Sequence, residues 1–473
     1  MKKLLLCATA AILSVGSAFA VTDGQTYAPT NGITCKNLWT LDRIHSLEAY
    51  RETKVADKAA RTACLHDGVI YVGNSAADEP EIVDDAGAVL NVASIDKFSM
   101  VDGSYLGRIK LTLDGVRHTG TLCANQVGFD DFGNLWVAPA AFSLKTGYKV
   151  YTVDPATGAM TLQGALPMTF DARIDYCDLV GDVTRVNAKC TVMAAGGPEV
   201  GVVYKWVAEQ GGAFEGGWAG DDNIVYSEFY PADQTVWGNA PTVTIVPGDG
   251  EYIYDAGLYY IDGFKTQPTL YNEANAISDS FANAAPDLAP VDAGTNGVAE
   301  MTLGGKNFLI YSYEQYVKGG TCKSYICELG AGMTFTGMSK YWQIPEDGLG
   351  AESDGGNRGH FLNCQMVKDA AGKEGAYLMT FKCYNGFGVY LIAEEGFAPA
   401  GVNDATVADG ATITVNGTVI TVSEEASEIT IVNLAGQTIS TAHNATEIAA
   451  PAAGAYIVKA IVAGAPVIKK VVL

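Results

Sequence analysis

The fold prediction starts from residues 125–140, NQVGFDDFGNLWVAPA, which are followed closely by residues 148–164, YKVYTVDPATGAMTLQG. Each part contains two runs of apolar, aromatic and β-branched residues, which are typical of strands. A tight turn separates the runs, first at Asp131-Phe132-Gly133-Asn134 and then at Asp154-Pro155-Ala156-Thr157-Gly158. Asp, Asn, Gly and Pro are the residues that such turns require. The segment therefore predicts an antiparallel unit of four short strands.

The same pattern recurs along the chain with different residues. Copies are predicted at residues 62–111, 125–164, 175–206, 241–272, 297–342 and 360–396. Repetition of a four-stranded unit is typical of a β-propeller, in which the strand edges are short and protected. The turn DDFGNLW (130–136) resembles the D-x-x-G-N-L-W type turn of extracellular β-propellers. We therefore predict an all-β fold with a six-bladed β-propeller at residues 21–398.

Two alternatives to six blades remain open. A seventh blade is possible if residues 21–60 or residues 207–240 contain a degenerate copy of the unit. The strand spacing also allows an array of β-sandwiches, because such arrays show similar runs and turns.

The first twenty residues have the pattern of a secretory signal peptide. Met1-Lys2-Lys3 is basic, residues 4–15 are apolar but too few to span a bilayer, and Ala18-Phe19-Ala20 is a small-x-small cleavage pattern. We expect cleavage after Ala20. No later stretch approaches the ~18 consecutive apolar residues of a membrane helix, so we predict no integral membrane segment.

The remaining chain is strongly acidic. Loss of residues 1–20 leaves 28 basic and 53 acidic side chains, a net charge of −25. Such a surface repels the phosphates of nucleic acid and anionic lipid, so we expect neither as a partner. The acidity is typical of solubility outside the cell rather than of a particular binding groove.

The composition changes near residue 399 and predicts a second domain. Residues 399–409 have the character of a linker. Beyond them, Asn416-Gly417 is the best two-residue hairpin turn and lies between two β-branched runs. Further strands are predicted at residues 428–440, 454–464 and 466–473, so residues 410–473 form a small immunoglobulin-like β-sandwich.

This C-terminal segment resembles the type A sorting domain of type IX secretion. The resemblance rests on IVNLAGQ (431–437), GAYIVK (454–459) and the basic apolar ending KKVVL (469–473). It implies that residues 410–473 bind the type IX secretion machinery and carry the protein from the periplasm across the outer membrane. The expected location is therefore the medium or the cell surface. Ala455 and Pro466 depart from the family's pattern and put cleavage of the domain in doubt.

The mature chain has nine cysteines, because Cys7 lies in the signal peptide. An odd number in an exported protein allows disulfides but leaves at least one free thiol. Cys177 and Cys190 flank a predicted hairpin, and Cys322 and Cys327 flank a small loop, so each pair is a candidate disulfide. No C-x-x-C and no pair of histidines at ligand spacing occurs, which gives no indication of zinc.

The standard catalytic signatures are missing from the sequence. It contains no G-x-S-x-G elbow, H-E-x-x-H pair, Walker A loop or Rossmann fingerprint. Gly248-Asp249-Gly250 and Asp130-Asp131 look like calcium ligands in isolation, but neither extends into a full calcium loop, and we interpret both as turns. We therefore predict no catalytic residue, no metal and no cofactor.

A candidate binding site follows from the repeat. The first strand of each blade begins at the mouth of the central channel, where propellers commonly bind ligands. The polar residues at these strand starts are Arg61, Asn125, Asp175, Asn296, Arg358 and His360. For any one of them, capping a strand or bridging two neighbouring blades is the favoured interpretation, so only their convergence predicts a ligand site.

Aromatic residues offer a second possibility. Tyr252 and Tyr254 are predicted to alternate along one face of a strand, followed by Tyr259-Tyr260, with Trp218 and Trp237 in a glycine-rich insertion. Exposed rings stack on sugars, whereas buried rings pack between blades.

Three functional classes follow, and the first is favoured. The first is a secreted or cell-surface propeller that binds a glycan, peptide or host macromolecule without transforming it. The second is a polysaccharide hydrolase or lyase, or a lactonase-like metal enzyme, for which Asp175, Glu300 and Glu352 are the acids to test. The third is a structural adhesin or scaffold.

Overall fold

The computed structural model describes most of the chain beyond residue 23. The described residues are 24–42, 60–141, 147–166, 172–197, 201–212, 224–229, 237–238, 240–248, 250–263, 266–289, 297–314, 322–349, 360–369, 371–383, 385–398, 412–416, 418–433, 438–450, 455–462 and 465–472. The predicted signal peptide and the predicted linker therefore lie outside them. Clustering of the chain gives two compact units, the second of which comprises residues 366–376 and 393–473.

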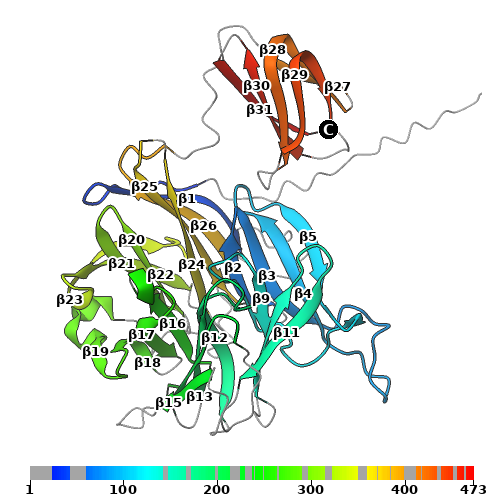
Figure 1. The fold of residues 1–473 in the computed structure, drawn as a ribbon. Helices are drawn as coiled ribbons and strands as arrows, with labels where there is room; N and C mark the ends of the chain where they lie inside the picture. Colours follow the sequence, from blue (N-terminus) through cyan, green and yellow to red (C-terminus); the bar gives the residue numbers. More distant parts are fainter. Residues whose placement is uncertain are drawn as a thin grey trace, which may run out of the picture. The chain divides into compact units, whose positions relative to one another are not determined.

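The fold is all-β, and its larger unit is a β-propeller (Figure 1). Its strands form six sheets within the described residues. The first, in the order β1-β26-β25-β24, contains β1 (Ile33–Asp42), β24 (His360–Lys368), β25 (Glu374–Lys382) and β26 (Gly386–Glu394). The second contains β2 (Ala60–His66), β3 (Val69–Ala76), β4 (Val92–Ser99) and β5 (Tyr105–Lys110). The third contains β6 (Thr112–Leu113), β7 (Val116–Arg117), β8 (Gln126–Phe129), β9 (Leu135–Ala138), β10 (Tyr148–Val153) and β11 (Ala159–Leu166).

The other three sheets follow in chain order. The fourth contains β12 (Arg173–Gly181), β13 (Cys190–Gly197), β14 (Val202–Ala208) and β15 (Ile224–Phe229). The fifth contains β16 (Thr242–Pro247), β17 (Ala256–Gly263), β18 (Thr266–Asn272) and β19 (Ile277–Ser280), with the 3-10 helices η1 (Gly250–Tyr252), η2 (Phe281–Asn283) and η3 (Pro286–Leu288). The sixth contains β20 (Val298–Leu303), β21 (Lys306–Glu314), β22 (Lys323–Gly330) and β23 (Thr334–Ile344).

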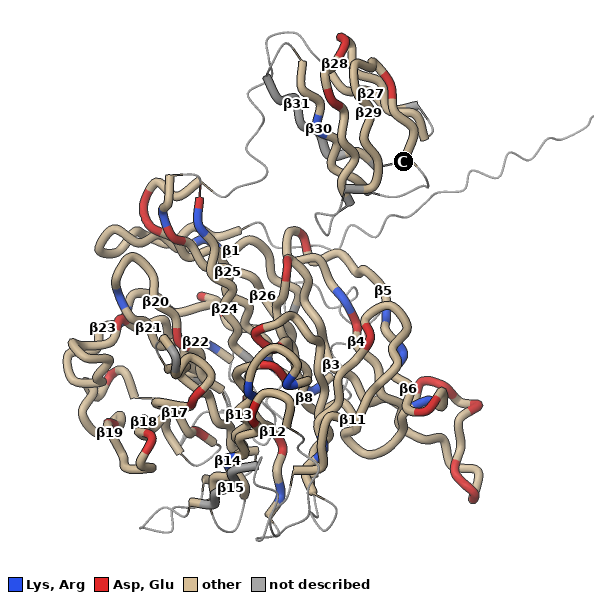
Figure 2. The backbone as a smooth tube through the Cα atoms, in the orientation of Figure 1, with Lys and Arg blue, Asp and Glu red and all other residues tan. Residues whose placement is uncertain are grey.

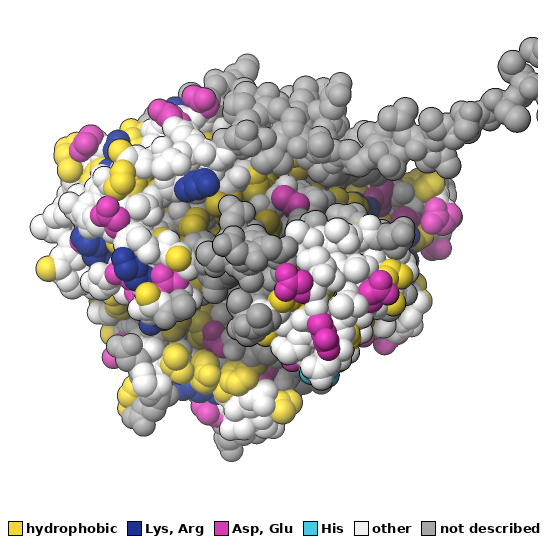
Figure 3. Space-filling view, turned by 90° about the horizontal axis from the view of Figure 1, so that it is seen from above, with side chains coloured by type: hydrophobic (Ala, Val, Ile, Leu, Met, Phe, Trp, Pro, Cys, Tyr) yellow, Lys and Arg dark blue, Asp and Glu magenta, His cyan; other side chains and the backbone are white. Residues whose placement is uncertain are grey.

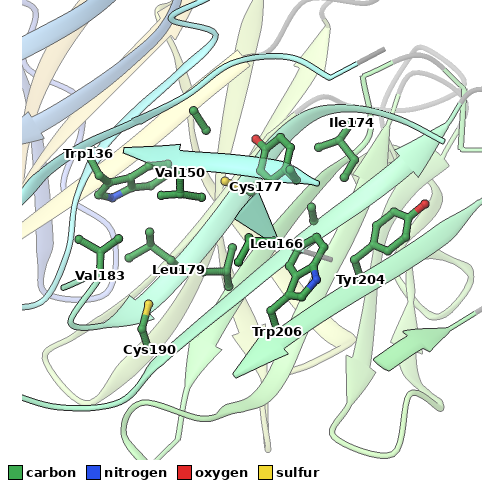
Figure 4. Close-up of a cluster of buried hydrophobic side chains, with 14 of the residues drawn as sticks. Trp136, Val150, Leu166, Ile174, Cys177, Leu179, Val183, Cys190, Tyr204 and Trp206 are labelled. Atoms are coloured by element: carbon green, nitrogen blue, oxygen red, sulfur yellow. The ribbon is translucent and has the colours of Figure 1, made fainter. Parts of the chain in front are cut away.

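Successive sheets pack face to face, and each junction has its own apolar core. Figure 4 shows one such core, in which Trp136 and Val150 of the third sheet face Ile174, Leu179 and Trp206 of the fourth. Comparable clusters join the first sheet to the second, the second to the third, the fourth to the fifth and the fifth to the sixth. Because the second to fifth sheets are covered on both faces, many of their strands are nearly continuous apolar runs in the sequence.

The segment before the first repeat closes the ring. Strand β1 pairs with β26, so the earliest and latest strands of the propeller share one sheet. Residues 24–31 lie beside the sixth sheet, where the Trp342 indole N–H donates to the Ala28 carbonyl at 2.9 Å. Strand β15, from the 207–240 segment, is the edge strand of the fourth sheet. Both segments that were candidates for a seventh blade thus supply edge strands to the sheets of predicted blades. The number of blades, six rather than seven, stays a prediction.

The turns use one repeated device, a carboxylate or amide oxygen at the first turn position. The Oδ1 atom of Asp84, Asp130, Asn272 and Asp369 accepts hydrogen bonds from the backbone N–H groups two and four residues later. This geometry satisfies backbone donors that would otherwise lack a partner in the turn. The predicted turn at Asp130 and Asp131 is therefore confirmed, and both carboxylates accept hydrogen bonds from backbone N–H groups.

The cysteine pairings suggested by the sequence are wrong. None of the nine cysteines among the described residues forms a disulfide. Cys177 faces Ala194 across β12 and β13, whereas Cys190 faces Gly181, so the two residues lie at different positions of the hairpin. Cys327 is buried and lies beside the Tyr311 hydroxyl, with its sulfur 3.8 Å from that oxygen. These side chains therefore fill core volume as small apolar residues.

The C-terminal residues form one network of five strands: β27 (Ile413–Asn416), β28 (Val419–Asn433), β29 (Thr438–Ala449), β30 (Ala455–Val462) and β31 (Ala465–Val472). β28 pairs with β29 along one edge and with β27 and then β30 along the other. Ile420 from one half of β28 and Ile431 from the other join Val458 in a single buried cluster. This part of the chain therefore has a core of its own.

Charged side chains lie mostly on loops and strand ends. Figure 2 shows acidic residues along many turns of the described chain, and Figure 3 shows acids interspersed with lysine and arginine on the face seen from above. Within the described ranges, no helix has the length and apolar character that crossing a bilayer requires.

Candidate functional site

The first strands of neighbouring sheets contact one another around the centre of the propeller and are joined by side chains. The contacts include those of β2 with β8, β12 with β8, β12 with β16 and β16 with β20. Because these strands have no partner on their inner edge, side chains of the neighbouring sheet satisfy some of their backbone groups. The Leu65 N–H donates to Asn363 Oδ1 at 2.9 Å, and the Ile245 N–H donates to Asp178 Oδ2 at 2.8 Å. Inner polar residues thus join the blades.

Three of the predicted site residues come together at the starts of the first strands of three sheets. Arg61 Nε donates to Asn125 Oδ1 at 3.2 Å, and Asn125 Nδ2 donates to the Asp175 carbonyl at 2.5 Å. Arg61 Nη2 lies 4.0 Å from Asp175 Oδ1. Arg173, two residues before Asp175, donates to the same Oδ1 at 2.6 Å. We call Arg61, Asn125, Arg173 and Asp175 the strand-start cluster.

The strand-start cluster is almost entirely buried. Arg61 is 5% exposed, and Asn125 and Asp175 are 0% exposed. Burial lowers the pKa of the Arg61 guanidinium, but Tyr176, Cys383 and the Asp175 carboxylate outweigh this effect and raise it, so the side chain stays charged. The cluster therefore joins three blades through the buried Arg61 guanidinium, the partly exposed Arg173 guanidinium and one buried carboxylate, and its bridging role is the one the structure supports.

The other predicted site residues are not brought into this cluster by the described structure. Asn296 and Arg358 lie outside the described residues, and so does Glu352. His360 is the first residue of β24, in the first sheet. Sequence reasoning missed Arg173, because the strand was expected to begin at Asp175. The signal was present as an arginine two positions before an acid, which places both side chains on one face of a strand.

Glu300 is a half-buried acid near the centre, on the first strand of the sixth sheet. Burial raises its pKa to about 7. Its charge also contributes, after burial, to the raised pKa of Tyr260 on β17 and of Cys364 on β24, the latter to about 12. Since β17 belongs to the preceding sheet and β24 to the following one, Glu300 lies where three sheets meet.

Replacing Glu300 by glutamine should stabilise the protein at pH 8 and leave it unchanged near pH 4. The folded state holds the Glu300 proton up to about pH 7, whereas the unfolded chain releases it near the ordinary value of 4.5. Stability therefore falls as the pH rises from 4.5 to 7, and the loss is complete above that window. We expect E300Q to gain about 2–3 kcal/mol at pH 8. Urea unfolding at pH 4, 6 and 8 measures this difference.

Glu328 provides a matched control for this measurement. Its carboxylate pairs with Lys306 at 3.0 Å, and the bonds to Tyr341 and Lys306 lower its pKa despite burial. E328Q should therefore lose rather than gain stability at neutral pH, by less than about 1 kcal/mol because the pair is partly exposed. If the stability of E300Q changed with pH as that of the wild type does, Glu300 would not be the group responsible for the loss of stability above pH 4.5.

The aromatic residues singled out in the sequence divide into two groups. Trp237, Tyr259 and Tyr260 are buried in the junctions between sheets, as the packing interpretation predicted. Tyr252 and Tyr254 do not alternate along a strand, because β16 ends at Pro247 and both lie in the loop before β17. Gly248 and Gly250 follow Pro247 closely in the sequence and favour the end of the strand there. Trp218 lies outside the described residues.

Comparisons with known proteins identify no family. No family model matches the chain, and no curated protein sequence matches it. Among solved structures, a DUF4623 family protein from Bacteroides eggerthii is 12% identical over 72% of this chain and 72% of its own, with a TM-score of 0.47. A glycosyl hydrolase from Bacteroides ovatus is 13% identical over 70% of this chain and 83% of its own, with a TM-score of 0.32.

The β-propeller domain of the Trilobed protease from Pyrococcus furiosus is 10% identical over 68% of this chain and 95% of its own, with a TM-score of 0.28. At these identities a likeness concerns the fold alone, and no activity is carried over from any of the three. The chain is thus an all-β protein whose larger unit is a β-propeller.

Proposed function

We propose that this protein is an exported β-propeller that binds an extracellular ligand without transforming it, with residues 410–473 as the address read by the type IX secretion machinery. One observation carries the proposal: residues 413–472 form a network of five strands with an apolar core of its own. A segment that builds its own core offers the machinery a folded surface to recognise. The proposed location is the medium or the outer-membrane surface, reached through the periplasm.

The burial and the hydrogen-bond partners of the candidate acids favour binding over hydrolysis. A glycosidase mechanism requires two carboxyl groups facing each other across a substrate. Asp175 is 0% exposed and engaged by Arg173, so it has neither access nor freedom to act. Glu300, Asp178 and Asp131 have the raised pKa that a general acid needs. Asp178 and Asp131, however, accept backbone N–H groups of a neighbouring sheet, from Ile245 and Gly181 respectively, which favours a role in joining blades.

Fractionation of cells tests the address. The full chain and a chain ending at Pro399 are expressed in a bacterium that carries type IX machinery, and each is located by immunoblot and mass spectrometry. The shortened chain keeps Ala398, whose N–H donates to Asp369 Oδ2 at 3.0 Å, so the β24–β25 turn stays intact. We expect the full chain at the surface or in the medium, and the shortened chain in the periplasm.

Folding of the shortened chain is the control, because a misfolded protein also fails to leave the periplasm. Its circular dichroism and its resistance to protease should match those of the propeller in the full chain. If both chains stay in the periplasm, or if both reach the surface, residues 410–473 are not an address.

A further inference from the structure

Three turns from three consecutive sheets are locked together at one end of the propeller. They are the β8–β9 turn, the β12–β13 turn and the β16–β17 loop. Each follows the first strand of its sheet, so all three lie at the end opposite the strand-start cluster. Turns held in this way have little freedom to move, so they form a preorganised surface that loses little conformational entropy when a ligand binds.

Two carboxylates fasten the β8–β9 turn to the neighbouring sheet. Asp131 Oδ2 accepts from the Gly181 N–H at 2.7 Å, and Asp130 Oδ2 accepts from the Val183 N–H at 2.9 Å. Asp130 Oδ1 also accepts from the Phe132 N–H at 2.9 Å. The backbone that carries Phe132 is therefore held by bonds within its own turn and by bonds to β12 and the turn after it.

The β16–β17 loop is fastened to the start of β13 from the other side. Thr191 Oγ1 donates to the Tyr254 carbonyl at 2.8 Å, and Lys189 Nζ lies 2.6 Å from Asp255 Oδ1. Gly248 packs against the same loop so closely that a Cβ atom there would lie 2.4 Å from the Tyr252 carbonyl oxygen. Any other residue at 248 would displace the loop.

These fixed turns present aromatic and aliphatic side chains to solvent. Tyr252 is 61% exposed, Ile253 is 46% exposed and Phe132 is 39% exposed. The Phe132 and Tyr254 rings, from different sheets, have centroids 5.8 Å apart and are tilted by 45°. We call Phe132, Tyr252, Ile253 and Tyr254 the aromatic platform. Apolar side chains that stay exposed on rigid turns add little to the stability of the fold. A group of them therefore points to a binding partner.

Polar groups beside the platform determine the chemistry of that partner. Lys189 and Asp255 neutralise each other, whereas Asp131 is partly buried, which raises its pKa. Among the described residues, Asp131 Oδ1 and Asp255 Oδ2 accept no hydrogen bond, so both can receive one from a ligand hydroxyl. An anionic ligand would be repelled by these acids. The combination of ring faces and free carboxylate oxygens suits a ligand with an apolar face and many hydroxyl groups.

We propose that the aromatic platform binds a neutral saccharide, with the sugar face on the rings of Phe132 and Tyr252 and its hydroxyl groups on Asp131 and Asp255. This inference rests on the proposed function, a propeller that binds an extracellular ligand, and names the ligand class and the site. The platform consists of four side chains, which fits one or two sugar rings better than the ~800 Å² that a protein partner commonly covers.

A glycan array tests the inference with the full chain after removal of residues 1–20. The array carries neutral plant, microbial and animal oligosaccharides, together with sialylated and sulfated ones. Titration calorimetry with the best neutral oligosaccharide then gives Kd for the wild type and for F132A and Y252A. We expect neutral glycans alone to bind, and each substitution to raise Kd by at least tenfold, because each removes an apolar ring face on which the sugar would stack.

Val116→Ala is the matched control, since Val116 is 69% exposed on β7, away from the platform. It should leave Kd unchanged. Binding of acidic glycans alone, binding of none, or binding that F132A and Y252A leave intact would each overturn the inference. Fractionation separates this result from the proposed function: an exported chain that binds no neutral glycan loses only this inference, whereas a chain retained in the periplasm loses only the address.

Discussion

Asp175→Ala should cost about 3–5 kcal/mol of the free energy of unfolding, more than most single substitutions in this protein. The variant leaves the Arg61 guanidinium buried with its only described carboxylate partner removed, and it takes away an acceptor of Arg173. A charge that stays buried without a partner is far more costly than the pair itself is stabilising. Urea unfolding monitored by tryptophan fluorescence at pH 7 measures the loss.

Two further variants show whether the charge or the contact matters. D175N keeps the shape of the side chain and one acceptor oxygen, so it should retain more stability than D175A. The double variant with Arg61→Met and Asp175→Leu removes both buried charges and should recover part of the loss, because apolar residues often replace a buried ion pair at little cost. A loss below about 1 kcal/mol for D175A would mean that the strand-start cluster does not hold the blades together.

This cluster shows how far the sequence predicted the site. The repeat places Arg61, Asn125 and Asp175 at corresponding positions of three blades, and that regularity correctly brought them together. Whether such residues face a ligand or each other depends on distances of a few ångströms between blades, which no local pattern contains. Arg173 was missed for a related reason, since the start of a strand is set by its partner strand as well as by its own residues.

The fold was more predictable, because its units are local. Each pair of adjacent strands is joined by a turn whose Asp, Asn and Gly residues are visible in the sequence, as at Asp130 and Asp154. The closing strand β1 was not assigned to any blade, because its partner β26 lies more than 340 residues further along the chain. The Tyr252 loop was read as a strand, because tyrosines favour strands unless neighbouring turn residues prevent pairing.

Removing the Trp39 side chain should lower the free energy of unfolding about as much as Asp175→Ala does, because Trp39 helps to close the propeller. Trp39 lies on β1, is 0% exposed, and donates its indole N–H to the Met100 carbonyl at 2.6 Å. Its ring meets Phe387 edge-on at 5.4 Å between centroids and lies against Gly103, whose φ of +69° and close approach both require glycine. We expect Trp39→Ala to lose about 3–5 kcal/mol, because the cavity opens at the junction of the first two sheets.

Trp39→Phe is the control for this substitution, and it should lose roughly 1–2 kcal/mol because most of the buried area remains while the bond to Met100 is lost. Urea unfolding measures both variants, and limited proteolysis shows whether cleavage begins in β1. If β1 closes the ring, W39A should be cut first within residues 33–42, since its pairing with β26 then opens before the other sheets unfold. Cleavage that begins elsewhere, with a loss of less than about 1 kcal/mol for W39A, would mean that the ring is held closed by the contacts between the inner strands instead.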